Sequence, residues 1–111
     1  MTSQGTAHGR FQRAICNRNL LNAEIAAREL GELSLADAFG FCLLLAEVDP
    51  PRFDRAIARW HARFVLEAQR ITADESALAL LAARGLANER LRETAAQTLR
   101  RLAQQHGVVQ G

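Results

Sequence analysis

Apolar residues recur at every third or fourth position over most of the chain, which is the spacing of one face of an α-helix. The pattern is interrupted at Gly31, Pro50, Thr72 and Gly85, where glycine, proline or a capping residue can end one helix or begin the next. We therefore expect an all-α fold of about five helices, over residues 10–30, 35–48, 50–70, 72–84 and 88–105.

Capping residues support three of these helix starts. Ser34 followed by Asp37, and Thr72 followed by Glu75, have the three-residue spacing of a capping box. Asp49 is expected to cap the third helix, because the proline that follows it loses no hydrogen bond at the first helical position.

A six-residue phrase, Arg-Phe-x-Arg-Ala-Ile, occurs at 10–15 and again at 52–57. It indicates a duplicated helical hairpin with a period of about 40 residues, in the range of HEAT and armadillo repeats, with the fifth helix as a final half-repeat. A plain five-helix bundle in which the phrase recurs by chance is equally compatible. Either way we predict one helical domain over 10–106, a disordered tail over 1–9 and a frayed C-terminus over 107–111.

Composition agrees with this fold class and bears on location. The chain is rich in Ala and Leu and has only two Pro, as expected of helices. Its longest apolar run, 39–46, is too short to span a membrane, and residues 1–9 lack the basic start and apolar run of a signal peptide. We expect a cytoplasmic protein with no membrane partner.

The net charge of +2 is small, but charge alternates along the chain. The segments of the first, third and fifth predicted helices are basic, and those of the second and fourth are acidic. Stacked hairpins would turn this alternation into one basic and one acidic layer.

The third predicted helix has the sharpest basic feature, a stripe of arginines within an arc of about 80° on a helical wheel. Its members are Arg52, Arg55, Arg59, Arg63 and Arg70. Guanidinium groups suit phosphates or the acidic surface of a partner. The alternative is a solvated helix face that Asp54 and Glu67 partly neutralise.

Beside this stripe lies an apolar one that we expect to face the core, with the only Trp at its middle. It consists of Phe53, Ile57, Trp60, Phe64 and Ala68.

The fifth predicted helix has a short heptad-like seam that could pair two chains into a homodimer. The seam contains Leu91, Ala95, Thr98, Leu102 and Gln105. Packing against the fourth helix is the alternative use of these residues.

The first predicted helix has an unusually polar interior, formed by Asn17, Arg18, Asn19 and Asn22. These side chains form either a buried polar network or a place where the helix opens to water.

Residues that could do chemistry do not gather into a motif. His8, His61 and His106 are far apart, so we expect no metal and no cofactor. The positions of Cys16 and Cys42 do not suit a disulfide, and we expect two buried, reduced thiols. With no phosphate-binding loop or nucleophile motif, we do not expect an enzyme.

Three stretches of the chain, FxRAI, NLLxAEIAARELGELSLADA and LLLAEVDPPRFDRAIARWHARFVLE, resemble small Arg/Ala-rich helical proteins that abound in actinobacteria as uncharacterised open reading frames. The resemblance covers residues 11 to about 85. It implies a bacterial cytoplasmic origin and an all-α fold, and it implies no site.

The hypothesis that the sequence favours is a non-enzymatic module for protein–protein interaction. It would bind an acidic partner surface, or a second copy of itself, through the arginine stripe. The alternative is sequence-independent binding of nucleic acid by the same stripe, through contacts to phosphates.

Overall fold

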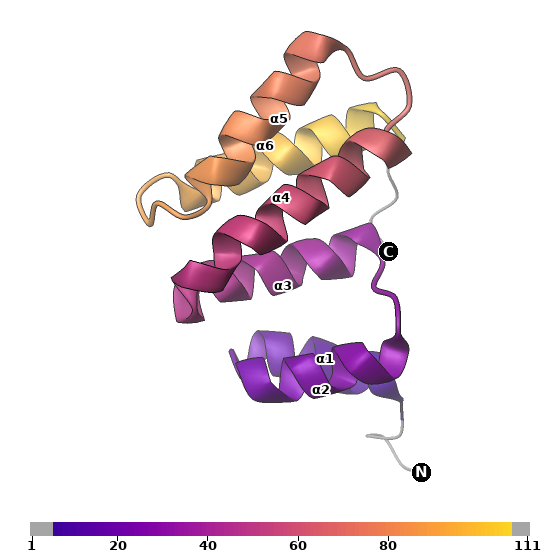
Figure 1. Cartoon of the computed structure of the whole chain (residues 1–111), viewed down its shortest axis with the longest axis vertical. Coiled ribbons are helices and arrows are strands. Elements are labelled where there is room, and N and C mark those ends of the chain that lie inside the picture. The colour runs from indigo at the N-terminus through magenta and orange to yellow at the C-terminus, as the bar shows by residue number, and fades with distance from the viewer. Residues whose placement is uncertain (1–5, 108–111) are drawn as a thin grey trace.

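The chain forms six helices in the computed structural model, which describes residues 6–107. They pair as three antiparallel hairpins that follow one another along the longest dimension of a 47 × 28 × 20 Å molecule (Figure 1). The helices are α1 (Ala7–Cys16), α2 (Leu20–Leu30), α3 (Leu35–Val48), α4 (Pro50–Glu67), α5 (Ala73–Gly85) and α6 (Arg92–Gln105). The predicted all-α class is confirmed.

The predicted number of helices is wrong by one, because the segment 10–30 is two helices and not one. Arg18 takes a φ of 58°, which reverses the chain after α1. Asn19 then caps α2, its side chain accepting a hydrogen bond of 3.1 Å from the backbone N–H of Asn22. The polar cluster of the predicted first helix is therefore an exposed turn and helix start, and not a buried network.

The extra helix also changes the interpretation of the repeated phrase and of the alternating charge. The repeated phrase opens the first hairpin in α1 but lies in the second helix of its own hairpin in α4, so its two copies are not in equivalent positions. Since α2 and α3 are consecutive and both net negative, the expected alternation of basic and acidic layers does not arise.

Helix starts at Ser34 and Thr72 are confirmed. The Ser34 hydroxyl accepts from the backbone N–H of Asp37 at 3.0 Å, and α3 has the predicted bounds. Thr72 and Glu75 form both hydrogen bonds of a capping box. Asp49 precedes α4 as expected, but its side chain makes no cap hydrogen bond and lies 3.6 Å from Arg52 instead.

Three predicted boundaries move. Helix α1 begins within the predicted tail, because Thr6 accepts a hydrogen bond of 2.9 Å from the N–H of Gly9. Helix α4 ends at Glu67, and α6 begins at Arg92. The remainder of the predicted tail, 1–5, and residues 108–111 of the predicted frayed end lie outside the described residues.

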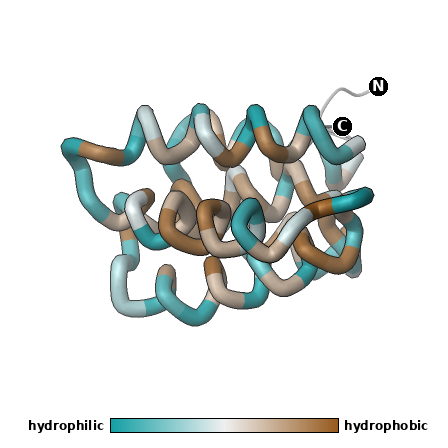
Figure 2. Tube along the Cα trace, turned by 90° about the horizontal axis from the view of Figure 1, so that it is seen from above, coloured by the Kyte–Doolittle hydropathy of each residue, from teal (hydrophilic) through white to brown (hydrophobic). Residues whose placement is uncertain are grey.

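Hydrophobic positions concentrate between the helices (Figure 2), and they form two separate buried clusters. Helices α3–α6 share the larger cluster, which is built on aromatic rings. Trp60 stacks on Phe64 with centroids 5.3 Å apart and lies 5.1 Å from Phe39. Its indole N–H donates to the carbonyl of Leu35 at 2.9 Å, so Trp60 is a core residue as predicted.

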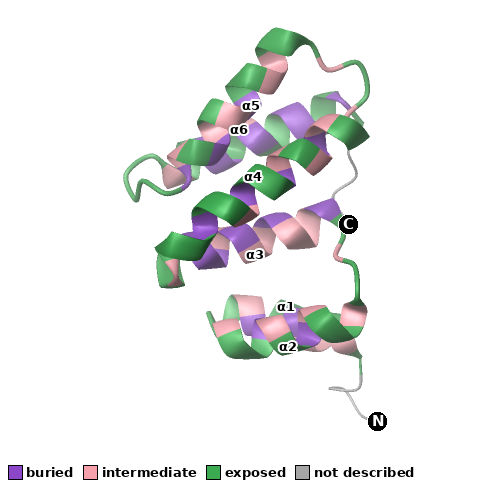
Figure 3. Cartoon of the chain, viewed as in Figure 1, coloured by how far each residue is buried: buried purple, intermediate pink, exposed green. Residues whose placement is uncertain are grey.

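The smaller cluster belongs to the α1–α2 hairpin. It buries Phe11, three alanines and, from the rest of the molecule, Leu44 of α3. Phe11 also stacks on Phe41 of α3, with ring centroids 6.4 Å apart, and Figure 3 shows buried positions on the hairpin helices and on α3. Polar pairs join the hairpin to α3 and α4 around this apolar contact. These are His8 with Asp37 at 3.0 Å, Gln12 with Asp37 at 2.9 Å, Glu24 with Arg52 at 2.8 Å, and Arg18 with Glu47.

Candidate functional site

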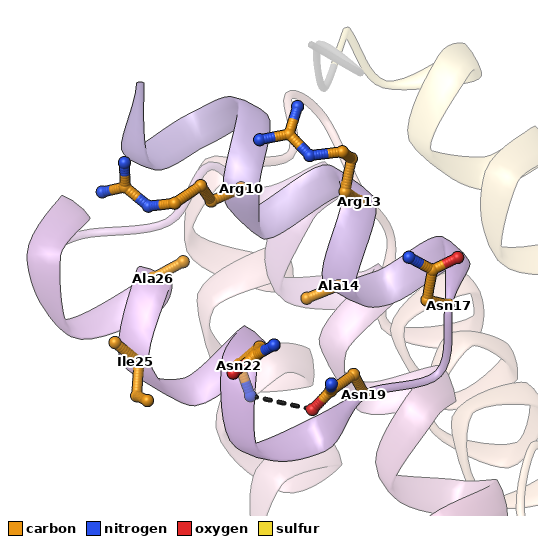
Figure 4. A pocket seen from close by; sticks show the side chains of 8 residues that line it. All are labelled: Arg10, Arg13, Ala14, Asn17, Asn19, Asn22, Ile25 and Ala26. Atoms are coloured by element: carbon orange, nitrogen blue, oxygen red, sulfur yellow. Dashed lines mark hydrogen bonds between the residues drawn. The ribbon is translucent and has the colours of Figure 1, made fainter. Parts of the chain in front are cut away.

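A groove of about 350 Å³ opens between α1 and α2, at the end of the molecule where the N-terminal hairpin lies. Its lining comes from both helices: Arg10, Arg13, Ala14 and Asn17 from α1 and its end, and Asn19, Asn22, Ile25 and Ala26 from α2 and its cap. Figure 4 shows the arginines along the α1 side, the asparagines at the turn and on α2, and the later helices behind the hairpin. The lining of the groove thus comes from the N-terminal hairpin.

Two buried alanines form the base of this groove. Ala14 and Ala26 are almost fully buried and belong to the small core. Because these side chains are small, α1 and α2 approach each other closely. No large side chain fills the space between the helices at this point, so the surface is concave. Ile25 adds an exposed apolar wall beside this base.

The charge of the groove is positive. Arg10 forms an ion pair with Glu29 of α2. Arg13 is exposed, and its guanidinium meets no carboxylate in the part of the chain that the structure describes. No carboxylate is among the residues that line the groove. An anionic group placed there would meet an arginine that has no competing partner.

The amides add neutral donors and acceptors. Asn19 uses its side-chain oxygen to cap α2, which leaves its NH₂ group for another partner. The side chains of Asn17 and Asn22 make no hydrogen bond within residues 6–107. A guanidinium together with amide N–H groups suits a carboxylate, which accepts from several donors at once.

The predicted arginine stripe is divided by the structure. Two members are used inside the fold: Arg52 pairs with Glu24, and Arg63 donates to Glu67 and to the carbonyl of Leu33, both at 2.6 Å. Arg70 lies in the turn after α4 with a φ of 60°, so it is not on the helix.

Arg55 and Arg59 are the stripe members that stay exposed on α4, one turn apart. Neither has an ion-pair partner among the described residues. The basic face of α4 is therefore a pair of arginines and not a row of five.

The predicted seam of the last helix is largely buried within the chain. Ala95 and Leu102 belong to the larger core, and Thr98 is half-buried, its hydroxyl donating to the carbonyl of Thr94 at 3.0 Å. Leu91 precedes α6 and is exposed. A dimer that uses this helix stays a prediction, but most of the apolar seam already packs inside one chain.

The remaining candidate residues are dispersed. Cys42 is buried, which raises the pKa of its thiol to about 12, whereas Cys16 is exposed, contrary to the expectation that both are buried. His61 lies 3.0 Å from the carbonyl of Ser76, a contact between α4 and α5. Among residues 6–107, no three His, Cys, Asp or Glu side chains are placed to hold a metal ion, and no helix is long and apolar enough to cross a membrane.

No protein-family model matches the chain, and neither a curated protein nor a solved structure is significantly similar to it. The resemblance to small actinobacterial helical proteins stays a prediction, and any function must be inferred from the geometry of the chain itself.

Proposed function

We propose that this protein is a non-enzymatic helical module that binds an acidic segment of a protein partner in the groove between α1 and α2. The observation that supports this most is a concave surface with an apolar base beside Arg13, whose guanidinium has no carboxylate partner among residues 6–107. Arg55 and Arg59 are weaker support, because an exposed charge pair alone contributes little to binding.

The chemistry of the lining favours a protein segment over a small inorganic anion. Arg13 and the asparagine amides can hold a carboxylate, while Ala14, Ala26 and Ile25 can receive an apolar side chain next to it. A groove between two helices is also the common seat of an amphipathic helix. The expected ligand therefore has Asp or Glu beside small or apolar residues on one helical face.

Peptide binding tests this function. The probe is a labelled helical peptide with two Glu and two Leu on one face, and its control has Gln in place of Glu. Fluorescence anisotropy should show the Glu peptide binding at least about tenfold tighter, since one charged hydrogen bond contributes roughly 1.5–3 kcal/mol. Equal affinity for the two peptides would overturn the proposal.

A matched pair of variants locates the site. Arg13→Ala should weaken binding of the Glu peptide by about tenfold. Arg101→Ala removes the same charge from an exposed position of α6 and should leave binding unchanged. An equal loss in both variants would mean that the peptide responds to overall charge and not to the groove.

A second candidate function is sequence-independent binding of nucleic acid by Arg55 and Arg59. It is favoured by the absence of carboxylate partners for these two side chains within the described residues. Anisotropy of labelled mixed-sequence DNA and RNA at about 50 and about 200 mM salt measures the salt slope. Each arginine that binds a phosphate should add roughly one to this slope.

The decisive comparison is between two double variants that have the same net charge as each other. Arg55→Ala with Arg59→Ala should flatten the slope, while Arg84→Ala with Arg101→Ala, two exposed arginines elsewhere, should not. No binding at the lower salt would remove this candidate.

A further inference from the structure

We infer that the segment which occupies the α1–α2 groove is the outer face of α5 from a second copy of this chain, so that copies join head to tail. The inference rests on the proposed function, because it names the partner of that same groove. Its evidence comes from the opposite end of the molecule.

Helix α5 is apolar on its outer side as well as its inner side. Ala79 and Ala83 are buried in the larger core, yet Leu78 and Leu81 on other faces are 46% and 69% exposed. Helices that are apolar all round are usually covered on all sides. The outer face of α5 therefore has the composition of an interface.

Helix α3 shows what full cover looks like in the same molecule. Helix α3 also has apolar residues on more than one side, and it packs against α4 on one side and against α1 and α2 on the other (Figure 1). Among the described helices, α5 packs closely against α4 and α6. The difference leaves one apolar helix face without a partner among residues 6–107.

Charge complements the groove. Asp74 is exposed one turn before Leu78, and no basic residue occurs in α5 before Arg84. The helix face thus presents a carboxylate beside leucines, which is the ligand pattern expected from the groove with its Arg13 and Ile25.

The two surfaces cannot meet within one chain. The α1–α2 hairpin and α5 lie toward opposite ends of the 47 Å dimension (Figure 1). A contact between different surfaces of identical chains is heterologous, and its repetition builds an open chain or a ring. Assembly should thus grow with concentration and weaken with salt.

Sedimentation velocity of the full chain tests the inference, from about 10 µM to about 0.5 mM at low salt. Two variants each remove one surface: Arg13→Glu alters the groove, and Leu81→Asp alters the face of α5. Each alone should raise the dissociation constant of self-association at least about tenfold. Far-ultraviolet circular dichroism checks that both remain folded.

Mixing the two variants is the sharpest measurement. The Leu81→Asp chain keeps an intact groove and the Arg13→Glu chain keeps an intact α5 face, so an equimolar mixture should form dimers that cannot grow further. Leu66→Asp alters an exposed leucine of α4 that is 86% accessible, and it should assemble like the unaltered chain.

Three results would overturn the inference: an unaltered chain that stays monomeric at the highest concentration, a mixture that stays monomeric, or an equal loss in Leu66→Asp. The proposed function is judged separately by the acidic peptide. A monomeric chain that still binds the peptide through Arg13 would remove the α5 partner and leave the groove as a binding site, whereas loss of both would remove the two proposals together.

Discussion

The N-terminal hairpin and the four helices that follow it are folded by different means. The α3–α6 part buries Trp60 and three phenylalanines together with several leucines. The α1–α2 hairpin buries one phenylalanine and three alanines, and it shares Leu44 with the rest. Since apolar burial stabilises in proportion to area, about 25 cal/mol per Å², the larger part has by far the greater share of the hydrophobic stabilisation.

The candidate binding site lies in the region with the smaller apolar core. The alanines that make the hairpin core small also make the base of the groove, so the same residues limit stability and provide the concave surface. Segments that bind partners are often those with few buried apolar contacts. Under the proposed function, the four-helix part would support the hairpin, and the hairpin would bind the partner.

Removal of an aromatic ring from the larger core should have the largest effect. Phe64 is fully buried and stacked on Trp60, so Phe64→Ala should lower the free energy of unfolding by about 3–5 kcal/mol. Urea denaturation followed by circular dichroism measures this loss. Leu66→Ala, at an exposed position two residues on, should stay within about 0.5 kcal/mol of the unaltered chain. Similar losses in both variants would contradict the burial of Phe64.

The equivalent change in the hairpin should have a local effect. Phe11→Ala removes the fully buried ring of the small core, which stacks on the partly buried Phe41, and should cost about 3 kcal/mol. This loss is enough to open the hairpin while the larger core stays folded. Hydrogen exchange should then accelerate in α1 and α2 and stay slow in α4 and α6. Equal acceleration in all helices would mean that the two regions unfold as one.

The difference between the regions also explains what the sequence could predict. Helix α3 was predicted with its observed bounds because Ser34 caps one end and Pro50 follows the other, and Trp60 was predicted as core because it lies in the middle of an apolar stripe. In the four-helix part, periodicity and local capping signals agree with the packing.

In the α1–α2 hairpin, periodicity and local capping signals do not agree with the packing. The turn at 17–19 contains neither Gly nor Pro, and the apolar spacing continues across it, so the pattern predicted one helix. Three asparagines within six residues were the available signal, because Asn favours N-cap positions. The groove exists only because the chain reverses there, and a pattern that missed the reversal could not predict it.

A smaller effect is expected where the hairpin meets α4. The guanidinium of Arg52 hydrogen-bonds to Glu24 and lowers the pKa of that carboxyl. Glu24→Gln should cost about 0.2–1 kcal/mol, as partly exposed ion pairs do, and high salt should reduce the loss. Hydrogen exchange should place the change in α2. A loss that is independent of salt would show that Glu24 contributes by packing and not by charge.

The last prediction concerns the C-terminal hairpin, which a buried histidine holds to its neighbour. The Nδ1 atom of His106 lies 2.6 Å from the carbonyl of Gln69 and donates to it, while its Nε2 atom lies 3.0 Å from Oε1 of Glu75. Two nearby oxygens favour the doubly protonated ring, and the hydrogen bond to Gln69, followed by the adjacent Glu75 carboxylate, raises the pKa of His106 above its usual 6.5.

A group whose pKa is raised on folding stabilises the fold fully below its unfolded pKa and loses that contribution as pH rises through the folded value. Urea midpoints should therefore fall as pH rises above about 6.5, the pKa of an unfolded histidine, and through the higher pKa of His106 in the folded chain. His106→Asn keeps a donor toward Gln69 but cannot be charged, so the variant should lack this part of the slope. A variant with the slope of the unaltered chain would assign the pH dependence to other groups and leave His106 as a packing contact alone.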